Sequence, residues 1–245
     1  MKQTRIDDEN TNELYTVLPT VKKDVKHEPN IELLNMDCLH YLKQCEDKQF
    51  DLAIVDPPYG IGEDGSRNKA DRPTAKWKNP KSQVYNTFDD SQIPSEEYFK
   101  QLVRVSKNQI VWGGNYFTEF LPPSKGWVVW NKKADIKEYL SMAELAWTSF
   151  DKKVNMFDYL WAGFKKKKQV KRIHPTQKPV DLYRWILQNY TKAGDKIIDT
   201  HLGSGSIAIA CYEEGFDLVG IEIDKQYFSD ANNRLELYKK QQTLF

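Results

Sequence analysis

The chain has 245 residues, of which 40% are hydrophobic and 29% charged, and 36 Lys and Arg balance 35 Asp and Glu to a formal net charge of +1. This composition excludes wholesale disorder, and no apolar stretch approaches the roughly 18 residues of a membrane span. Three scattered cysteines without a CxxC pair argue against a disulfide framework or a structural zinc site, and a polar start without a secretory signal predicts a cytoplasmic protein.

The first half of the chain alternates predicted strands and helices. Residues 1–29 lack sustained apolar periodicity and predict a polar tail or covering segment. The remainder, 30–245, is expected to form one domain. Its first predicted elements are a strand at 31–37, a helix at 38–45, a strand at 50–56, a helix at 94–106 and a strand at 108–112. The polar segment 60–91 predicts an insertion loop, because loops of that length in compact domains are usually functional or mobile.

The second half is more regular. We predict two strands, expected to be antiparallel, at 125–132 and 142–150, and a helix at 179–191. The last quarter of the chain predicts, in order, a strand, a Gly-rich turn, a helix that ends at Gly215, a second strand and a terminal helix. This βαβ pattern predicts an α/β fold with a doubly wound, mostly parallel sheet.

Positive charge is concentrated in two segments. Residues 159–180 contain seven basic and no acidic residues, and residues 60–88 contain six basic and three acidic ones. This asymmetry predicts a nucleic-acid-facing side, although a solvated basic loop is the alternative. The candidate nucleic-acid contacts are Arg67, Lys76, Trp77, Lys165, Lys166, Lys167, Lys168 and Arg172.

The Gly-rich turn HLGSGS follows a predicted strand and precedes a predicted helix. Gly203 and Gly205 would let a nucleoside-bearing ligand approach the backbone and the helix N-terminus. Glu222 ends the next strand, 19 residues after Gly203, at the spacing of an acid that binds ribose hydroxyls. A tight turn without a ligand is the alternative.

A second motif, Asp56-Pro57-Pro58-Tyr59, falls at the end of an apolar strand. The prolines fix the backbone and remove competing amides, so the turn presents a carboxylate, carbonyl oxygens and an aromatic ring. Those groups suit a planar base with an exocyclic amino group, which would donate both N–H bonds while its face stacks on the ring. The alternative is a strand end closed by a Pro-Pro turn.

Taken in order, the pieces NMDCLHYL, FDLAIVDPPYGIG, IVWGGN, VVWNK, AELAW, HPTQKPVDLYRWIL, DTHLGSGSIAIA and VGIEID resemble the amino-group DNA methyltransferases that use S-adenosylmethionine. The resemblance is to the permuted (β-type) class, in which the catalytic motif precedes the cofactor motif. It implies a Rossmann-like, mostly parallel seven-stranded sheet with circularly permuted motif order. Asp rather than Ser before Pro-Pro-Tyr resembles enzymes of restriction-modification type that methylate adenine N6 in DNA after flipping the base.

The resemblance also implies roles for particular residues. The catalytic residues, which hold the flipped adenine, would be Asp56, Pro57, Pro58 and Tyr59. The cofactor-binding residues would be Asp37, Cys38, Asp56, Thr176, Lys178, Asp199, His201, Gly203, Ser204, Gly205 and Glu222. His201 stands where the family usually has Phe. Double-stranded DNA is the implied partner and a homodimer is allowed, whereas the four histidines lack the spacing of metal ligands.

Several alternatives remain open at this point. The basic recognition region is short, 148–173, so recognition would be minimal or would involve the 60–91 insertion. Cytosine N4 in DNA and adenine N6 in RNA are alternative targets. A catalytically silent nucleic-acid-binding relative is another alternative. A nicotinamide-dependent oxidoreductase would instead carry a three-glycine fingerprint near the start of its fold.

Overall fold

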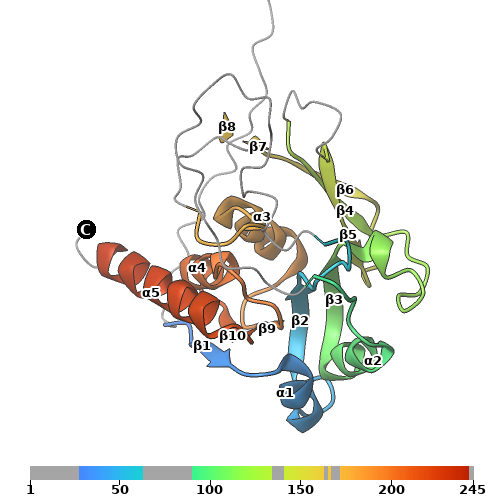
Figure 1. Ribbon diagram of the computed structural model, residues 1–245, viewed down its shortest axis with the longest axis horizontal. Coiled ribbons are helices and arrows are strands. Elements are labelled where there is room, and N and C mark those ends of the chain that lie inside the picture. Colours follow the sequence, from blue (N-terminus) through green and yellow to red (C-terminus); the bar gives the residue numbers. More distant parts are fainter. Residues whose placement is uncertain (1–27, 63–89, 134–140, 163–164, 167–171, 243–245) are drawn as a thin grey trace, which may run out of the picture.

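The computed structural model describes residues 28–62, 90–133, 141–162, 165–166 and 172–242 (Figure 1). Its elements are β1 (Ile31–Asn35), α1 (Cys38–Gln44), β2 (Phe50–Val55), α2 (Glu96–Val105), β3 (Ser106–Trp112), η2 (Gly114–Tyr116), β4 (Trp127–Asn131), β5 (Ala143–Thr148), β6 (Asn155–Asp158), β7 (Trp161–Ala162), β8 (Lys165–Lys166), α3 (Val180–Tyr190), β9 (Lys196–Asp199), α4 (Ser206–Glu214), β10 (Asp217–Glu222) and α5 (Lys225–Gln242). None of these helices combines the length and apolar character needed to cross a bilayer.

The described strands form one large sheet in the order β1-β10-β9-β2-β3-β5-β4-β6, with β7 and β8 as a separate pair. The five strands from β1 to β3 are mutually parallel, and β5 is antiparallel to both β3 and β4. The α/β, mostly parallel prediction is confirmed, but the count of seven strands is wrong, because the sheet has eight. The short β6 adds to the edge by pairing parallel to β4, with Met156 opposite Val129.

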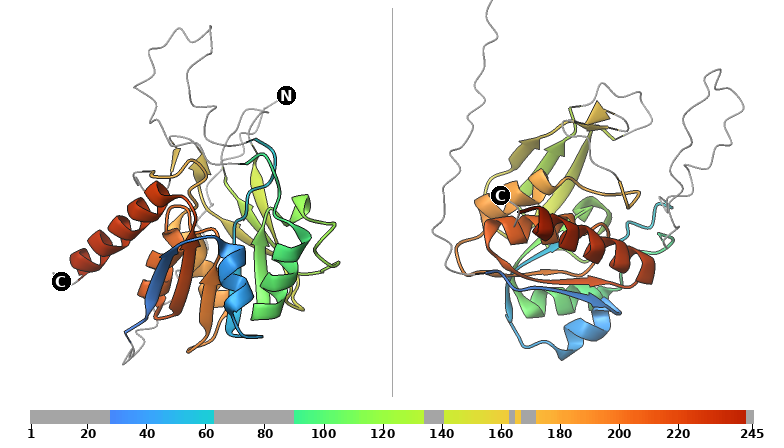
Figure 2. Two further views of the ribbon diagram at one scale, coloured as in Figure 1. Left: turned by 60° about the horizontal axis from the view of Figure 1, so that its bottom comes forward. Right: turned by 90° about the vertical axis from the view of Figure 1, so that its left-hand side faces the viewer.

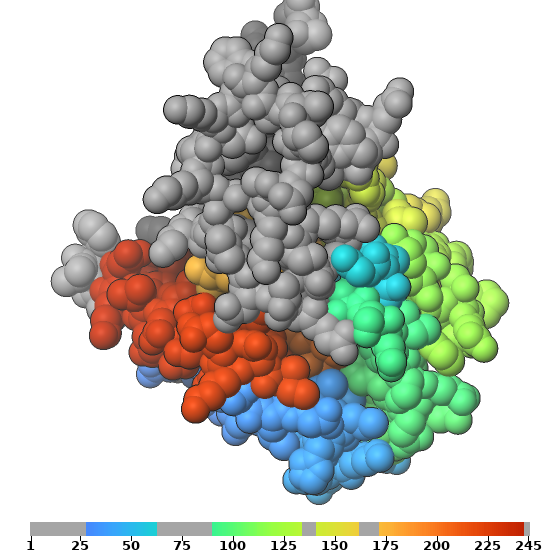
Figure 3. Space-filling view, in the orientation of Figure 1, coloured from blue at the N-terminus to red at the C-terminus, as the bar shows by residue number. Residues whose placement is uncertain are grey.

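Helices cover both faces of the sheet, as the doubly wound prediction requires. The right-hand view of Figure 2 shows α5 on one side and α1 and α2 on the other. One apolar cluster joins the sheet to α3, α4 and α5, and a second joins it to α1 and α2. In the space-filling view of Figure 3, α5 adjoins the surface of the β1 and α1 segment, and α5 packs along β1 and β10.

Local sequence explains where the helices begin and end. Asp37 caps α1 by accepting a hydrogen bond from the His40 amide at 2.7 Å, and Ser95 caps α2 through the Tyr98 amide at 3.3 Å. Gly215 ends α4 in the left-handed conformation that glycine adopts without a steric penalty. These boundaries agree with the predicted ones to within a few residues.

The chain reverses its direction of travel across the sheet between β2 and β9. From β9 it proceeds through α4 to β10, and from β2 it proceeds through α2 to β3 on the other side. In open α/β sheets, ligands bind at the carboxyl ends of the strands where the order reverses. Asp56 follows β2 and Asp199 ends β9, so both acids lie at that position.

Candidate active site

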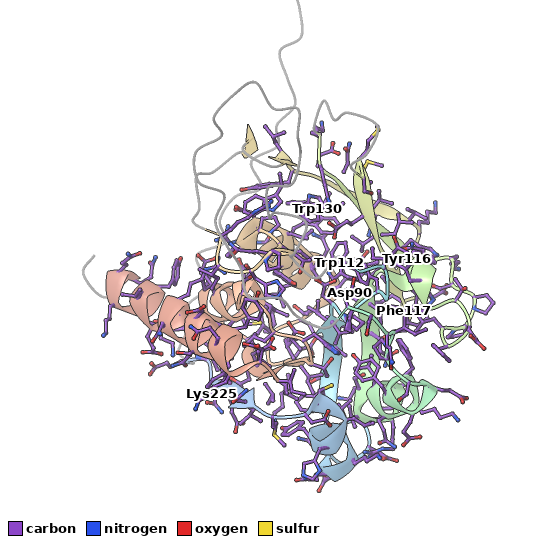
Figure 4. All side chains as sticks on the ribbon, in the orientation of Figure 1. Asp90, Trp112, Tyr116, Phe117, Trp130 and Lys225 are labelled. Carbon is purple, nitrogen blue, oxygen red and sulfur yellow. The ribbon has the colours of Figure 1, made fainter. Side chains whose placement is uncertain are left out.

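The turn after β2 is fixed by an aspartate from outside the motif. Asp90 is 3% exposed, and its Oδ1 accepts the backbone N–H groups of Tyr59 at 2.7 Å and Gly60 at 3.0 Å. Within the turn, the Tyr59 hydroxyl donates to Asp56 Oδ1 at 2.6 Å. Figure 4 labels Asp90 near the end of β2. Asp90 thus completes the turn that the prolines begin.

The Tyr59 ring is held by its neighbours. It stacks on Tyr116, with ring centroids 5.1 Å apart and planes 16° from parallel, and meets the Phe117 ring edge-on at 6.1 Å. Gly113 is needed beside it, because a Cβ there would lie 2.2 Å from Tyr59 Cε1. Burial and the Asp56 charge raise the pKa of Tyr59 well above its ordinary value, so the hydroxyl remains a donor.

Four charged side chains alternate in sign next to this turn. The Lys178 ammonium contacts Asp56 Oδ2 and lies 3.2 Å from Glu144 Oε2, while Glu144 Oε1 lies 2.7 Å from Lys132 Nζ. Burial would lower the pKa of Lys178, but Asp56 and Glu144 outweigh it and raise that pKa. Burial likewise opposes ionisation of Glu144, yet the two ammonium groups lower its pKa to about 2. Lys178 and Glu144 therefore both remain charged despite their burial.

Glu222 and Arg234 fix the Gly-rich turn. Glu222 Oε2 accepts the Gly203 amide at 2.8 Å, and Gly203 and Gly205 have left-handed φ angles of 51° and 68°. Arg234 Nη1, from α5, donates to the Ser204 carbonyl at 2.8 Å and to Ser206 Oγ at 3.0 Å. The backbone of the predicted cofactor turn is therefore anchored from both β10 and α5.

Two buried acids face this region from adjacent strands. Asp199 is 1% exposed, and its Oδ1 accepts the His201 amide at 3.0 Å. Burial, with contributions from Asp56 and Glu222, raises the pKa of Asp199 to about 8. Burial also raises the pKa of Glu222. The structure therefore brings Asp199 and Glu222 together at the carboxyl ends of β9 and β10, while their cofactor-binding role stays a prediction.

His201 lies in a buried polar chain. Its Nδ1 is 2.9 Å from Thr200 Oγ1, which is 2.7 Å from the Tyr98 hydroxyl. The His201 and Tyr98 rings meet edge-on at 5.4 Å. Burial lowers the pKa of His201 to about 4, so this imidazole is neutral at pH 7.

The structure also brings Asp37, Cys38 and Thr176 to this side of the sheet. Burial, with contributions from the Asp37 and Glu222 charges, raises the pKa of Cys38 to about 12. Thr176 Oγ1 lies 3.1 Å from His174 Nδ1, and a Cβ on Gly203 would lie 3.7 Å from the His174 ring. His174, which sequence reasoning did not select, therefore links the segment around Thr176 to the Gly-rich turn.

Most of the predicted nucleic-acid contacts lie outside the described residues. These are Arg67, Lys76, Trp77, Lys167 and Lys168, together with the side chains of Lys165 and Lys166, whose backbone forms β8. Arg172 is described, and its guanidinium carbon lies 5.5 Å from the Trp161 ring centroid. Trp161 Nε1 in turn donates to the Gln177 carbonyl at 3.1 Å. Arg172 is thus connected through packing to the residue before Lys178.

Acidic side chains at the ends of adjacent parallel strands, a glycine turn and a rigid carboxylate-aromatic turn lie together at the edge of a Rossmann-like sheet where nucleoside ligands bind in folds of this kind. This is the arrangement of a methyltransferase acting on a base. The chain belongs to the N6/N4 DNA methylase family, which it matches over residues 74–233.

Proteins of similar sequence are also methyltransferases by name. Type II methyltransferase M2.DpnII of Streptococcus pneumoniae is 25% identical in an alignment of length 251. The alignment covers 83% of this chain and 89% of the relative. Type II methyltransferase M2.MboI of Moraxella bovis is 25% identical in an alignment of length 245. This alignment covers 84% of this chain and 87% of the relative. The predicted class, a DNA methyltransferase that uses S-adenosylmethionine, is therefore confirmed, and the oxidoreductase alternative is wrong.

Solved structures share the fold. The M1.HpyAVI–SAM complex is 19% identical, with a TM-score of 0.53, and the match covers 84% of this chain and all of that one (100%). The PvuII DNA methyltransferase, a cytosine-N4-specific enzyme, is 11% identical with a TM-score of 0.54, covering 87% and 92%. At these identities the comparison confirms the Rossmann-like architecture.

Proposed function

We propose that this methyltransferase transfers the methyl group of S-adenosylmethionine to the N6 amino group of adenine in double-stranded DNA, and that Asp56, Pro57 and Tyr59 hold the extruded base. The observation that carries the proposal is the turn after β2. The Tyr59 hydroxyl orients its carboxylate, and Asp90 orients its backbone. The strand before this turn, β2, is the neighbour of β9, which leads into the Gly-rich turn. Asp before Pro-Pro-Tyr favours adenine N6 over cytosine N4.

The residues around the Gly-rich turn fit S-adenosylmethionine. Glu222 uses one lone pair on each oxygen for the Gly203 and Asp224 amides, so further lone pairs can accept ribose hydroxyls. Asp199 and Asp37 place further carboxyl oxygens at the ends of the strands beside the nucleoside. When bound, the cofactor supplies a methyl group attached to a positively charged sulfur.

The Asp56 turn addresses the low nucleophilicity of an adenine amino group, whose lone pair is delocalised into the ring. The Asp56 carboxylate and the Pro57 carbonyl would accept its two N–H bonds and favour a pyramidal nitrogen. In the transfer, a nitrogen–carbon bond would form as the carbon–sulfur bond breaks, and the methylated nitrogen would release one proton to solvent water. Lys178 is already protonated and cannot accept that proton. The turn acts by positioning and electrostatics.

Base extrusion costs a few kcal/mol. Stacking on the Tyr59 ring, which its neighbours hold in place, would offset part of that cost. Phosphate contacts from the basic segments would supply the remainder.

The first test is a transfer assay with labelled S-adenosylmethionine, using unmethylated duplex DNA and RNA in parallel, followed by identification of the modified nucleoside. We expect N6-methyladenine from DNA. Asp56→Ala should lower the rate by at least about 100-fold, because it removes the amino-group acceptor, while calorimetry still detects cofactor binding. Asp47→Ala, which changes a surface carboxylate paired with Arg104, is the control.

Each other outcome contradicts a stated part of the proposal. Label in cytosine or in RNA would show that adenine in DNA is not the substrate. Undiminished transfer by Asp56→Ala would remove Asp56 from the mechanism. A wild-type protein that binds the cofactor without methylating any substrate would favour the binding-protein alternative. Light scattering on the same sample tests the homodimer that the resemblance allows.

A further inference from the structure

Glu144 is a partly buried acid to which neither the motifs nor the family resemblance assigns a role. It lies near the start of β5, opposite Trp130 of β4, and reaches Lys178 at 3.2 Å and Lys132 at 2.7 Å. The Lys178 side chain is only 3% exposed, and its ammonium lies 5.2 Å from the Trp112 ring centroid. Because almost no water reaches this ammonium, its charge is balanced by the two carboxylates that it contacts.

The position of this ammonium matters for methyl transfer. Lys178 contacts the oxygen of Asp56 that the Tyr59 hydroxyl does not use. Without Glu144, Asp56 would be the only carboxylate partner of Lys178 among the described residues, and Lys178 would compete more strongly with an incoming amino group for Asp56. Its unbalanced positive charge would also oppose the positive charge that develops on the attacking nitrogen.

We infer that Glu144 is a positioning residue for methyl transfer: it holds the Lys178 ammonium between two carboxylates, so that Asp56 stays oriented and retains an acceptor site for the target amino group. This inference rests on the proposed role of Asp56. It assigns no contact between Glu144 and either substrate. Lys132 supports the arrangement from the far side, where its ammonium also lies 5.3 Å from the Trp130 ring centroid.

A double-mutant cycle tests the inference, using Glu144→Gln, Lys178→Met and the double variant. Glu144→Gln should lower kcat by about 10- to 100-fold, because small misplacements of a reacting group have effects of this size. KM for DNA and Kd for S-adenosylmethionine should stay within about threefold of wild type. The double variant should be no slower than the slower single variant, because Glu144 acts through Lys178.

The matched control is Glu213→Gln, which makes the same change in a comparably buried ion pair with Arg184. The Glu213 and Glu144 side chains are 18% and 25% exposed. This control should lower the melting temperature without lowering kcat. If Glu144→Gln does not fold, Glu144→Asp retains the charge but shortens its reach, and it should still reduce kcat.

A folded Glu144 variant with wild-type kcat, or losses that multiply in the double variant, would overturn the inference. Loss through KM or cofactor affinity alone would also overturn it. Failure of the wild-type protein to methylate DNA is a separate result, since it rejects the proposed function and appears before any variant is compared.

Discussion

At the scale of single residues, two acids of the site have opposite environments. Glu144 faces two ammonium groups, which lower its pKa to about 2 despite burial. Asp199 is buried beside other carboxylates, and its pKa rises to about 8. The site therefore contains one carboxylate that remains ionised and another that holds a proton at neutral pH, and the two should respond differently to pH.

Asp199 should make the protein less stable as pH rises. Its carboxyl group binds a proton in the folded state up to a pKa of about 8, whereas in the unfolded state the pKa has the ordinary value of 3.8. Between these two values the folded state holds more protons, so stability falls with increasing pH. Asp199→Asn removes this dependence and keeps an oxygen that can accept the His201 amide.

We therefore expect Asp199→Asn to be more stable than wild type at pH 8.5, with an advantage that shrinks towards pH 5 by about 2–4 kcal/mol. Urea unfolding at both pH values measures this difference. The neutral histidines His174 and His201, whose pKa values fall to about 4, affect both proteins equally. Asp151→Asn, at an exposed carboxylate, should show no such trend. An advantage that is constant with pH would contradict the prediction.

The sequence identifies only part of the site because only part of it is contiguous. Asp56 and Tyr59 belong to one motif, and Gly203 and Glu222 have a recognisable spacing. Asp90 lies 31 residues from Tyr59, and Arg234 lies 30 residues from Ser204. These partners, like Glu144, stand in segments whose local pattern shows only a loop, a helix or a strand. Their role depends on tertiary contacts that no single segment specifies.

At the scale of elements, strong hydrophobic periodicity was sufficient to predict a helix or a strand. Short segments carried too little of it to be predicted. The βαβ unit from β9 to β10 and the antiparallel pair β4 and β5 form as predicted. The four-residue β6 and the two-residue β7 and β8 lie within the region 148–173, for which the sequence predicted only basic recognition functions. Strands this short carry too little alternation to be recognised, and β6 forms because the exposed edge of β4 is available.

The helix α5 supports the Gly-rich turn, where we propose that the cofactor binds, through Arg234. Arg234→Met removes both hydrogen bonds to the Gly-rich turn while retaining much of the apolar stem. We expect the Kd for S-adenosylmethionine to rise by about tenfold and the unfolding free energy to fall by about 1–3 kcal/mol. Calorimetric titration and urea unfolding measure the two effects. Lys239→Met, at a more exposed pair with Glu236 on the same helix, should change neither. Unchanged affinity would show that α5 does not support the turn.

At the scale of the whole molecule, two groups of candidate site residues meet at the point where the strand order reverses. The β9 and β10 side carries the glycine turn and the acids that we propose bind the cofactor, and the β2 and β3 side carries the rigid turn that we propose binds the base. Lys178 connects the two, because its side chain meets Asp56 while its carbonyl accepts Ser206 Oγ at 2.7 Å. One loop before α3 thus contacts both proposed halves of the site.

The near-zero net charge of the whole chain conceals the segment that we expect to bind DNA phosphates. Replacing Lys165, Lys166, Lys167 and Lys168 by Gln removes four of the seven positive charges between residues 159 and 180. Each phosphate contact that is lost should reduce the slope of log affinity against log salt by about 0.9, so the slope should fall by up to about 4. Fluorescence anisotropy on duplex DNA at several salt concentrations measures this slope. Affinity for S-adenosylmethionine should not change, because none of these four lysines is among the residues that we propose bind the cofactor. An unchanged slope would instead identify the lysines as a solvated loop.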